Sequence, residues 1–290
     1  MRPNHHQFVA FAYVVREGSF SAAASELGVT QSTITQHVAK LEQNVGAQLL
    51  WRRRDGVEVT ATGQALYDLA DRLVAVDMAI SERLEGFASM KDGRIKVIAN
   101  APQPALGIIA RFNKAFPQIH IDFGLHDWTT ATSMIRDRLA DVGLITDPPL
   151  ADEWERHLLQ STRYVAYCRS DDPLAGEKEL SLHQIADRTV ILPEKGSLTQ
   201  RIVRERLQAH GLTLRKSVSM TTFPVMCEAV LQGIGIAIFL RNSSLIKEGL
   251  VELELSDFDQ EHGTWLVAPK DRARLRLISE FTASAISATI

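Results

Sequence analysis

Hydrophobic residues in the first sixty positions recur at the three- and four-residue steps of helices, and glycines separate the runs. An apolar face that starts at Phe8 predicts a first helix, which Gly18 ends. Closely spaced alanines predict a short second helix that Gly28 closes with a left-handed turn. Thr30 is placed to cap a third helix, whose predicted buried stripe is Ile34, Val38, Leu41 and Val45.

The first turns of the third helix present uncharged hydrogen-bonding side chains: Gln31, Ser32, Thr33, Thr35 and Gln36. Such a helix, joined to a short helix by a tight glycine turn, suits a helix-turn-helix, whose second helix enters the major groove of DNA. Gln pairs well with adenine, and Ser and Thr contact bases or phosphates. A small helical bundle without a DNA role has the same pattern, so neighbouring features must decide.

A cationic hairpin is predicted directly after these helices. The arginines Arg52, Arg53 and Arg54 precede an Asp-Gly turn, and an alternating strand follows at residues 57–59. Such a wing carries cations for phosphates or the minor groove. Consecutive arginines also occur on solvated surfaces. The succession of short helices and cationic hairpin nevertheless favours a winged helix-turn-helix over residues 1–60.

Residues 61–92 are predicted to form one long linker helix that Thr60 caps. Its hydrophobic residues have near-heptad spacing: Leu66, Leu69, Leu73, Val76, Ile80 and Leu84. This seam predicts pairing with a second copy of the chain, which would give a homodimer with two DNA-reading heads. The alternative is an amphipathic helix that lies on its own domain.

From residue 93 the pattern changes to strands that alternate with helices, which predicts βαβ units and a parallel-type sheet. The predicted strands are RIKVIAN, IHIDFGL, DVGLIT, YVAYC, TVILP, SVSM, IAIFL and TWLVAP. We expect an effector-binding domain of two α/β lobes over residues 93–290. The first lobe spans about 93–163 and 268–290, and the second spans about 164–267.

Three segments follow predicted strands and begin helices, which is where ligands bind to open α/β sheets. They contain Asn100, Ala101, Pro102 and Gln103, then Trp128, Thr129 and Thr130, then Ser197, Leu198 and Thr199. Hydroxyls beside free backbone N–H groups suit an oxyanion, so we expect a small anionic metabolite, with Trp128 and Phe223 as apolar walls. Each hydroxyl can instead merely cap its own helix.

Composition and motifs argue against secreted, membrane-spanning, metal-binding and nucleotide-binding functions. A hydrophobic content of 45% and a net charge of −3 fit a soluble globular protein in which DNA-binding charge is local. No secretory signal or membrane-spanning run is evident, so a cytoplasmic location is expected. The two cysteines, Cys168 and Cys227, lack metal-type spacing, and nucleotide and zinc-protease signatures are absent. We therefore expect no metal, cofactor or catalytic residue.

Three other functions remain open from the residues alone. A solute-binding protein would need export, and an α/β enzyme with a helical appendage would turn over a substrate without salt-dependent DNA affinity. A redox sensor would act through the two cysteines. All three rank below a DNA-binding regulator. No signal peptide for export is visible, and the sequence supplies no base or electropositive setting for a reactive cysteine.

The chain as a whole resembles a LysR-type transcriptional regulator. The resemblance rests on GSFSAAASELGVTQSTITQHVAKLEQNVGAQLL, on the arginine-bearing wing, and on VTATGQAL at the start of the linker helix. LADVGLIT and LQGIGIAIFL match the sensor region of the family. The resemblance implies a dimer or tetramer whose sensor lobes, similar to a type 2 periplasmic binding protein, clamp a small effector and so change how the DNA-binding domains sit on promoter DNA. It also makes RNA polymerase a candidate partner.

Overall fold

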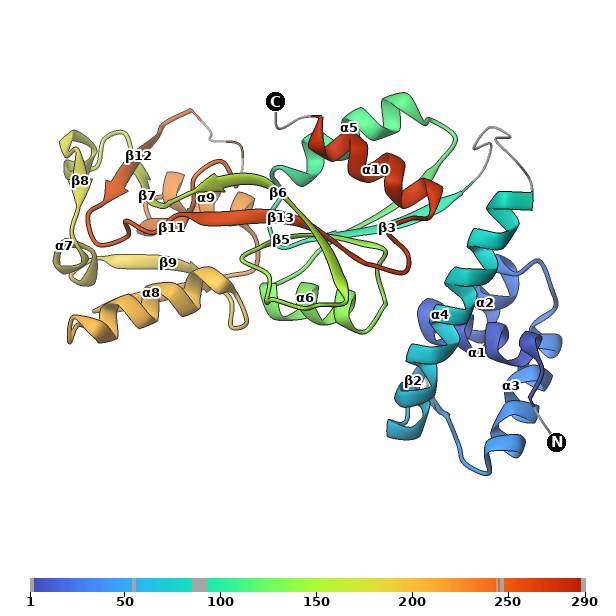
Figure 1. The fold of residues 1–290 in the computed structure, drawn as a ribbon. Helices are drawn as coiled ribbons and strands as arrows, with labels where there is room; N and C mark the ends of the chain where they lie inside the picture. Colours follow the sequence, from blue (N-terminus) through green and yellow to red (C-terminus); the bar gives the residue numbers. More distant parts are fainter. Residues whose placement is uncertain (1–2, 54–55, 85–92, 244, 246–247, 288–290) are drawn as a thin grey trace. The chain divides into compact units, whose positions relative to one another are not determined.

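The computed structural model of the chain describes residues 3–53, 56–84, 93–243, 245 and 248–287 (Figure 1). These residues form two compact units. Unit 1 comprises Met1–Ser89, Arg136–Leu139 and Pro269–Arg276, and unit 2 comprises Met90–Ile135, Ala140–Ala268 and Leu277–Ile290. Unit 1 therefore includes two short segments from the second half of the chain.

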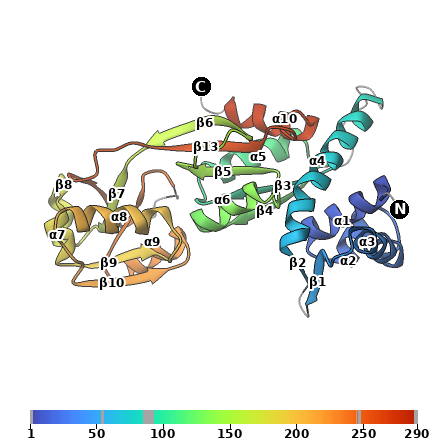
Figure 2. The ribbon, with the colours of Figure 1, turned by 60° about the horizontal axis from the view of Figure 1, so that its bottom comes forward.

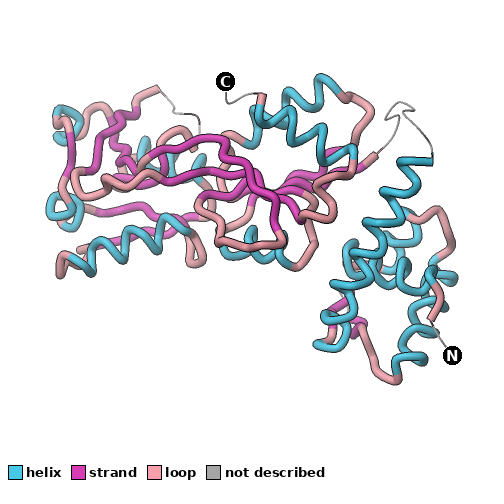
Figure 3. Tube along the Cα trace, in the orientation of Figure 1, coloured by secondary structure: helices cyan, strands magenta, loops and turns pink. Residues whose placement is uncertain are grey.

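Unit 1 is helical apart from one antiparallel hairpin (Figure 3). Its elements are α1 (His5–Glu17), α2 (Phe20–Glu26), α3 (Gln31–Val45), β1 (Leu50–Arg53), β2 (Gly56–Val59) and α4 (Ala61–Leu84). The predicted turns are confirmed, because Gly18 ends α1 with a left-handed φ of 66° and the Thr30 hydroxyl caps α3. Aromatic and aliphatic side chains, among them the fully buried Phe11 and Leu41, make one core between the helices.

One residue of the predicted α3 stripe is exposed, and parts of the predicted wing and linker helix lie outside the described residues. Val45, expected in the buried stripe of α3, is 39% exposed, because it is the last residue of the helix before the Gly46 cap. Arg54 and the aspartate of the predicted turn lie outside the described residues. So do residues 85–92 of the predicted linker helix and the side chain of Leu84.

Helix α4 has two apolar faces. Tyr67, Ala70 and Val74 are buried in the core of unit 1, as expected of a helix that lies on its own domain. Leu66, predicted for the seam between copies, is half-buried against the same core. The exposed members of the predicted seam are Leu69, Leu73, Val76 and Ile80. The helix thus packs on its own unit and leaves a second apolar stripe uncovered.

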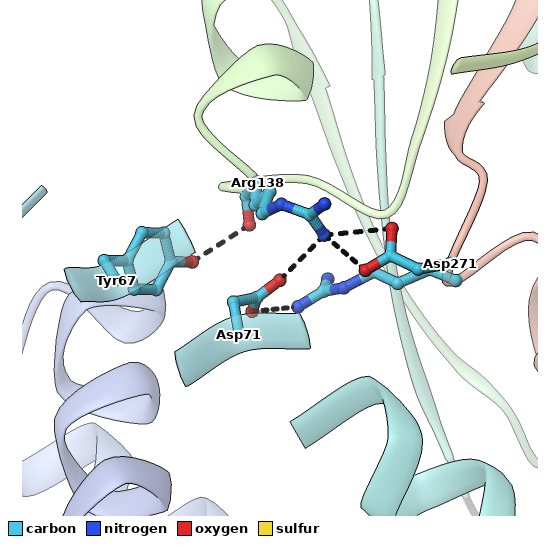
Figure 4. A network of polar contacts seen from close by, with 5 residues as sticks. Tyr67, Asp71, Arg138 and Asp271 are labelled. Carbon is cyan, nitrogen blue, oxygen red and sulfur yellow. Dashed lines mark hydrogen bonds and ion pairs between the residues drawn. The ribbon is translucent and has the colours of Figure 1, made fainter. Parts of the chain in front are cut away.

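Four charged side chains form an ion cluster inside unit 1, in which Asp71, Arg138 and Arg272 are buried and Asp271 is exposed (Figure 4). The Arg138 guanidinium bonds to the Asp71 carboxylate of α4 at 3.3 Å and to the Asp271 carboxylate at 2.8 Å, and Arg272 donates to the other oxygen of Asp71. Tyr67 donates its hydroxyl proton to the carbonyl of Arg138 at 3.2 Å. Asp71 and Arg272 are almost fully buried, and the four charges sum to zero. Each ion would be costly to bury alone, so the cluster depends on all its pairs.

The first sheet of unit 2 has the strand order β4-β3-β5-β13-β6. Its strands are β3 (Arg94–Ala99), β4 (His120–Leu125), β5 (Val142–Thr146), β6 (Trp154–Thr162) and β13 (His262–Pro269). Helices α5 (Ala105–Ala115) and α10 (Arg276–Ile286) lie together on one face, and α6 (Trp128–Arg136) covers the other (Figures 1 and 2). Phe112 of α5 and Phe281 of α10 meet edge to face, with ring centroids 5.1 Å apart.

The second sheet has the order β10-β9-β11-β7-β12-β8. Its strands are β7 (Tyr164–Arg169), β8 (Glu179–Leu180), β9 (Thr189–Pro193), β10 (Lys216–Met220), β11 (Ile236–Leu240) and β12 (Leu250–Leu255), and its helices are η1 (Pro173–Gly176), α7 (Leu182–Ala186), α8 (Leu198–Ala209) and α9 (Phe223–Leu231). Alternate strand residues face opposite sides. Val190 and Ile238 pack with α7 and α8, whereas Ile191 and Phe239 pack with α9.

Both sheets differ from the parallel type that the sequence predicts. β13 runs antiparallel to β5, and β11 and β12 run antiparallel to β7. The edge strand β6 was missed because polar side chains interrupt its alternation, and β8 because it has two residues. Since β13 pairs in the first sheet, the chain leaves the second lobe before His262, not at about residue 267.

Replacing Asp71 with asparagine is expected to lower the free energy of unfolding by about 3–5 kcal/mol, because the arginines of the ion cluster lose a buried counter-charge. Asp68→Asn is the matched control, since Asp68 is an exposed carboxylate on the same helix, and it should change stability by less than about 0.5 kcal/mol. Urea unfolding followed by circular dichroism measures both variants. Equal stability of the two variants would contradict a structural role for the cluster.

Candidate DNA-binding surface and effector pocket

The start of α3 offers polar side chains at the surface of unit 1. Of the predicted base-reading residues, Gln31, Ser32 and Gln36 are exposed, whereas Thr33 and Thr35 are half-buried. The Thr33 hydroxyl lies 2.9 Å from that of Thr30, within the N-cap of the helix. The hydroxyl of Thr33 is therefore engaged locally, and the freest hydrogen-bonding groups belong to the two glutamines and Ser32.

The described wing arginines have different surroundings. The Arg52 guanidinium carbon lies 4.5 Å from the centroid of the Phe20 ring. Arg53 instead donates through Nε to Glu58 on the opposite strand at 2.6 Å and lies beside the Trp51 ring. The sequence could not distinguish these two arginines, because their partners lie on other elements of the domain.

The predicted effector residues meet at a pocket of about 180 Å³ in unit 2. The predicted residues that line it are Asn100, Ala101, Trp128, Ser197, Leu198, Thr199 and Phe223. The pocket lies where strands of both sheets end and the helices after them begin. Four other predicted residues, Pro102, Gln103, Thr129 and Thr130, are not among its lining residues.

The helix starts of the second lobe leave backbone donors open at the pocket. No side chain caps α8 at Ser197 or α9 at Thr222. Within the described part of the chain, the N–H groups of Leu198, Thr199 and Phe223 have no hydrogen-bond acceptor. These groups carry the partial positive charge of a helix N-terminus, which attracts anions.

The corresponding helix start of the first lobe is already closed. Asp127 accepts from the backbone N–H of Thr129 at 2.9 Å and of Thr130 at 3.2 Å, and also from the Thr130 hydroxyl. The Thr129 hydroxyl donates to the Gly196 carbonyl at 3.1 Å. In this structure the Asp127 carboxylate and the Gly196 carbonyl therefore accept the donors that the sequence assigns to a ligand, and a ligand contact by Thr129 or Thr130 stays a prediction. Gln103 likewise donates its backbone N–H to Ser243.

The half-buried Trp128 and the buried Tyr164 complete the pocket wall. Trp128 donates its indole N–H to the Thr146 carbonyl at 2.8 Å, and its ring lies 4.5 Å below the Arg201 guanidinium carbon. Burial raises the pKa of Tyr164, so its hydroxyl stays protonated. That hydroxyl accepts from Thr199 at 3.4 Å, and its own proton has no acceptor among the described residues. The pocket thus contains a buried O–H donor beside the open helix starts.

Sequence reasoning missed several lining residues. They include Leu125, His126, Asp127, Thr146, Tyr164, Glu194, Thr221, Thr222, Leu240 and Ser243. Most lie at or directly beyond the end of a strand, a position that could have marked them. Tyr164 lies at the first residue of a strand, and no local signal identifies it.

The described residues give little support for metal binding, for cysteine redox chemistry or for a membrane-spanning helix. No three His, Cys, Asp or Glu side chains there gather as a metal-binding group. Cys168 and Cys227 are both buried and are not disulfide-bonded to any described residue, and burial raises the pKa of the Cys168 thiol, which disfavours the reactive thiolate. None of the described helices combines the length and apolar character that crossing a membrane requires.

A winged helix-turn-helix domain and a two-lobed α/β binding domain together define a one-component regulator, in which a single chain joins a DNA reader to a ligand sensor. Two family descriptions match the chain: "Bacterial regulatory helix-turn-helix protein, lysR family" at residues 5–64 and "LysR substrate binding domain" at residues 91–288. The chain therefore belongs to the LysR family of transcriptional regulators, and the resemblance seen in the sequence is confirmed.

Characterised relatives share its full length at low identity. The chain is 27% identical to the HTH-type transcriptional activator CmpR of Synechocystis sp. over 283 residues, which cover 95% of this chain and 92% of CmpR. It is 25% identical to the RuBisCO operon transcriptional regulator of Allochromatium vinosum, over 92% of this chain and 90% of the relative.

Solved structures confirm the fold. A full-length OxyR variant from Pseudomonas aeruginosa superposes with a TM-score of 0.79 at 16% identity, covering 98% of both chains. Full-length CbnR in complex with its target DNA gives 0.53 at 17% identity, over 97% of this chain and 99% of CbnR. The regulatory domain of Synechocystis CcmR in complex with 2-PG gives 0.61 at 17% identity, over 68% of this chain and 97% of that domain.

Proposed function

We propose that this regulator binds promoter DNA in the cytoplasm as a homodimer or tetramer, and that a small anionic metabolite in the unit 2 pocket modulates this binding. RNA polymerase is a further proposed partner. The proposal includes no catalytic step and no cofactor. The observation that carries it is a pocket where two open helix starts meet, in a chain that also holds a DNA-reading domain.

The donor set of the pocket supports an anionic effector. The uncapped starts of α8 and α9 contribute backbone N–H groups, and Tyr164 adds a protonated hydroxyl. Oxyanions accept such bonds with a favourable helix dipole behind them. The CcmR regulatory domain, which has the same fold, was solved with 2-PG bound. The carboxylates of Asp127 in the first lobe and Glu194 in the second lobe also line the pocket, so the negative group of the ligand should lie at the open starts of α8 and α9, away from both carboxylates.

The exposed surface of unit 1 supports DNA binding by α3 and the wing. The exposed glutamines and Ser32 of α3 can reach base edges, while wing arginines contact phosphates or the minor groove. CbnR, with which this chain shares its fold, was solved with its target DNA. A duplex from the region upstream of the chain's own gene is the first fragment to test in a gel shift. Failure to bind it or any promoter fragment at low ionic strength would refute the proposal.

The uncovered stripe of α4 supports self-association. Leu69, Leu73, Val76 and Ile80 repeat at steps of three and four, and each is at least 38% exposed. An exposed apolar stripe on a helix is a pairing surface, because association removes it from water. We assign this stripe to the homodimer.

We predict different effects for the helix and wing variants. Arg52→Ala should weaken binding to every duplex and reduce the slope of log affinity against log salt by about 1, because one phosphate contact is lost. Gln31→Ala should instead weaken binding to the operator by about 1–3 kcal/mol and leave random duplex affinity unchanged. Fluorescence anisotropy at several salt concentrations separates the two effects. Unchanged affinities in both variants would rule out this DNA-binding surface.

We predict that Leu73→Glu weakens the dimer, because it places a charge in the apolar stripe of α4. Leu150→Glu is the matched control, since Leu150 is an 89% exposed leucine of unit 2, and it should leave the dimer intact. Sedimentation velocity over a range of protein concentrations measures both. A dimer of Leu73→Glu as stable as that of the control would exclude the stripe from the interface.

We predict that Ser197→Asp weakens anion binding without unfolding the protein. An aspartate N-cap stabilises α8 but occupies its open N–H groups with a negative charge, whereas Ser197→Asn caps the helix without charge. With inorganic phosphate as the probe at constant ionic strength, thermal shift should show an affinity at least about tenfold lower for the aspartate variant than for the asparagine variant. Equal phosphate affinities would argue against the anion site.

A further inference from the structure

The wing is fastened to the turn between α1 and α2. Val57 of β2 donates its backbone N–H to the Gly18 carbonyl at 3.1 Å. A Cβ atom on Gly56 would lie 2.8 Å from the same oxygen, so only glycine allows this close approach. The hairpin therefore has a fixed position relative to the first residues of α2.

Phe20 begins α2 directly beneath this hairpin. The preceding residue, Ser19, caps the helix by accepting from the Ala22 N–H, which fixes the start of α2. Phe20 is 8% exposed and belongs to the core of unit 1, and one face of its ring is available to the wing. The Arg52 guanidinium carbon lies over that face, 4.5 Å from the ring centroid.

This contact orients Arg52 without using its hydrogen-bond donors. A guanidinium that stacks on an aromatic face engages the ring through its flat side, so its N–H groups point outward in the plane. Arg52 has no hydrogen bond or ion pair to any of the described residues. Its donors therefore remain open to a phosphate or a groove edge.

The neighbouring Arg53 already forms an ion pair within the protein. Arg53 is bound to the Glu58 carboxylate across the hairpin, and its charge is offset within the protein. Of the two wing arginines that the structure describes, Arg52 is therefore the better suited to contact a duplex.

We infer that Phe20 is a positioning residue for DNA binding: its ring holds the Arg52 guanidinium at the base of the wing with its donors open. The inference rests on the proposed DNA-binding role of the wing. It predicts that Phe20 affects DNA affinity only through Arg52.

A double-mutant cycle on the full-length protein tests this, with a fluorescently labelled random-sequence duplex as the probe. Phe20→Leu should weaken binding about two- to fivefold in the wild-type background, because the cation–π contact is lost. The same change should have no further effect in the Arg52→Ala background. Phe20→Met, which also lacks a ring but fills the core differently, should behave as Phe20→Leu, and Phe20→Tyr should retain wild-type affinity.

The outcomes separate the inference from the proposed function. Suppose that Phe20→Leu lowers DNA affinity by the same factor in the wild-type and Arg52→Ala backgrounds, with thermal midpoints unchanged. This result would overturn the inference while leaving the wing as a DNA contact. Wild-type affinity in both ring-deficient variants would overturn it as well. If Arg52→Ala itself leaves affinity and salt slope unchanged, the proposed role of the wing fails first, and the inference fails with it.

Discussion

The ion cluster is the constraint on which unit 1 depends. Desolvating a carboxylate or guanidinium costs several kcal/mol, and only complete pairing offsets that cost. Asp71 of α4 is shared by Arg138 and Arg272, which come from segments far along the chain. Arg138 also keeps a left-handed backbone, φ 58°, that a non-glycine residue adopts at some cost. The cluster therefore contributes a specific alignment of α4 with these segments more than it contributes net stability.

The two lobes of the pocket differ in whether their helix starts are capped by a side chain. In the first lobe the Asp127 carboxylate caps the N-terminus of α6 by accepting hydrogen bonds from its first backbone N–H groups. In the second lobe α8 and α9 begin without a side-chain cap, and the protonated Tyr164 hydroxyl lies beside them. In the proposed anion site, an oxyanion would be attracted to the uncapped starts of α8 and α9 and repelled by Asp127. The proposed site would therefore select the orientation of a ligand as well as its charge.

The features that the sequence predicted correctly are those set by residues close together in the chain, namely turns, helix caps and strands. The turn at Gly18, the cap at Thr30 and most strands of the two sheets follow from spacing and cap chemistry, whereas β6, β8 and β12 were missed. The ion cluster could not be predicted, because Asp71 and Arg272 look like solvated charges until the fold brings them together. The capping of α6 by Asp127 was missed for a different reason: the threonines beside it seemed to be the functional groups. The errors therefore have two sources. Some side chains have partners far away in the sequence, and one capping residue lies directly before the segment singled out as a ligand site.

Helix α4 shows how one amphipathic pattern can serve two surfaces. Tyr67, Ala70 and Val74 face the core of unit 1, and the predicted seam from Leu69 to Ile80 faces away from it. A hydrophobic pattern alone indicates which positions are apolar but not which stripe each belongs to, and Leu66, predicted for the seam, is half-buried against the core of unit 1. The buried charge of Asp71 resolves the ambiguity, because a carboxylate bonded to two arginines fixes the rotation of the helix about its own axis. The ion cluster and the core residues of α4 together leave the second stripe exposed, and this stripe is the one that we propose pairs with a second copy of the chain.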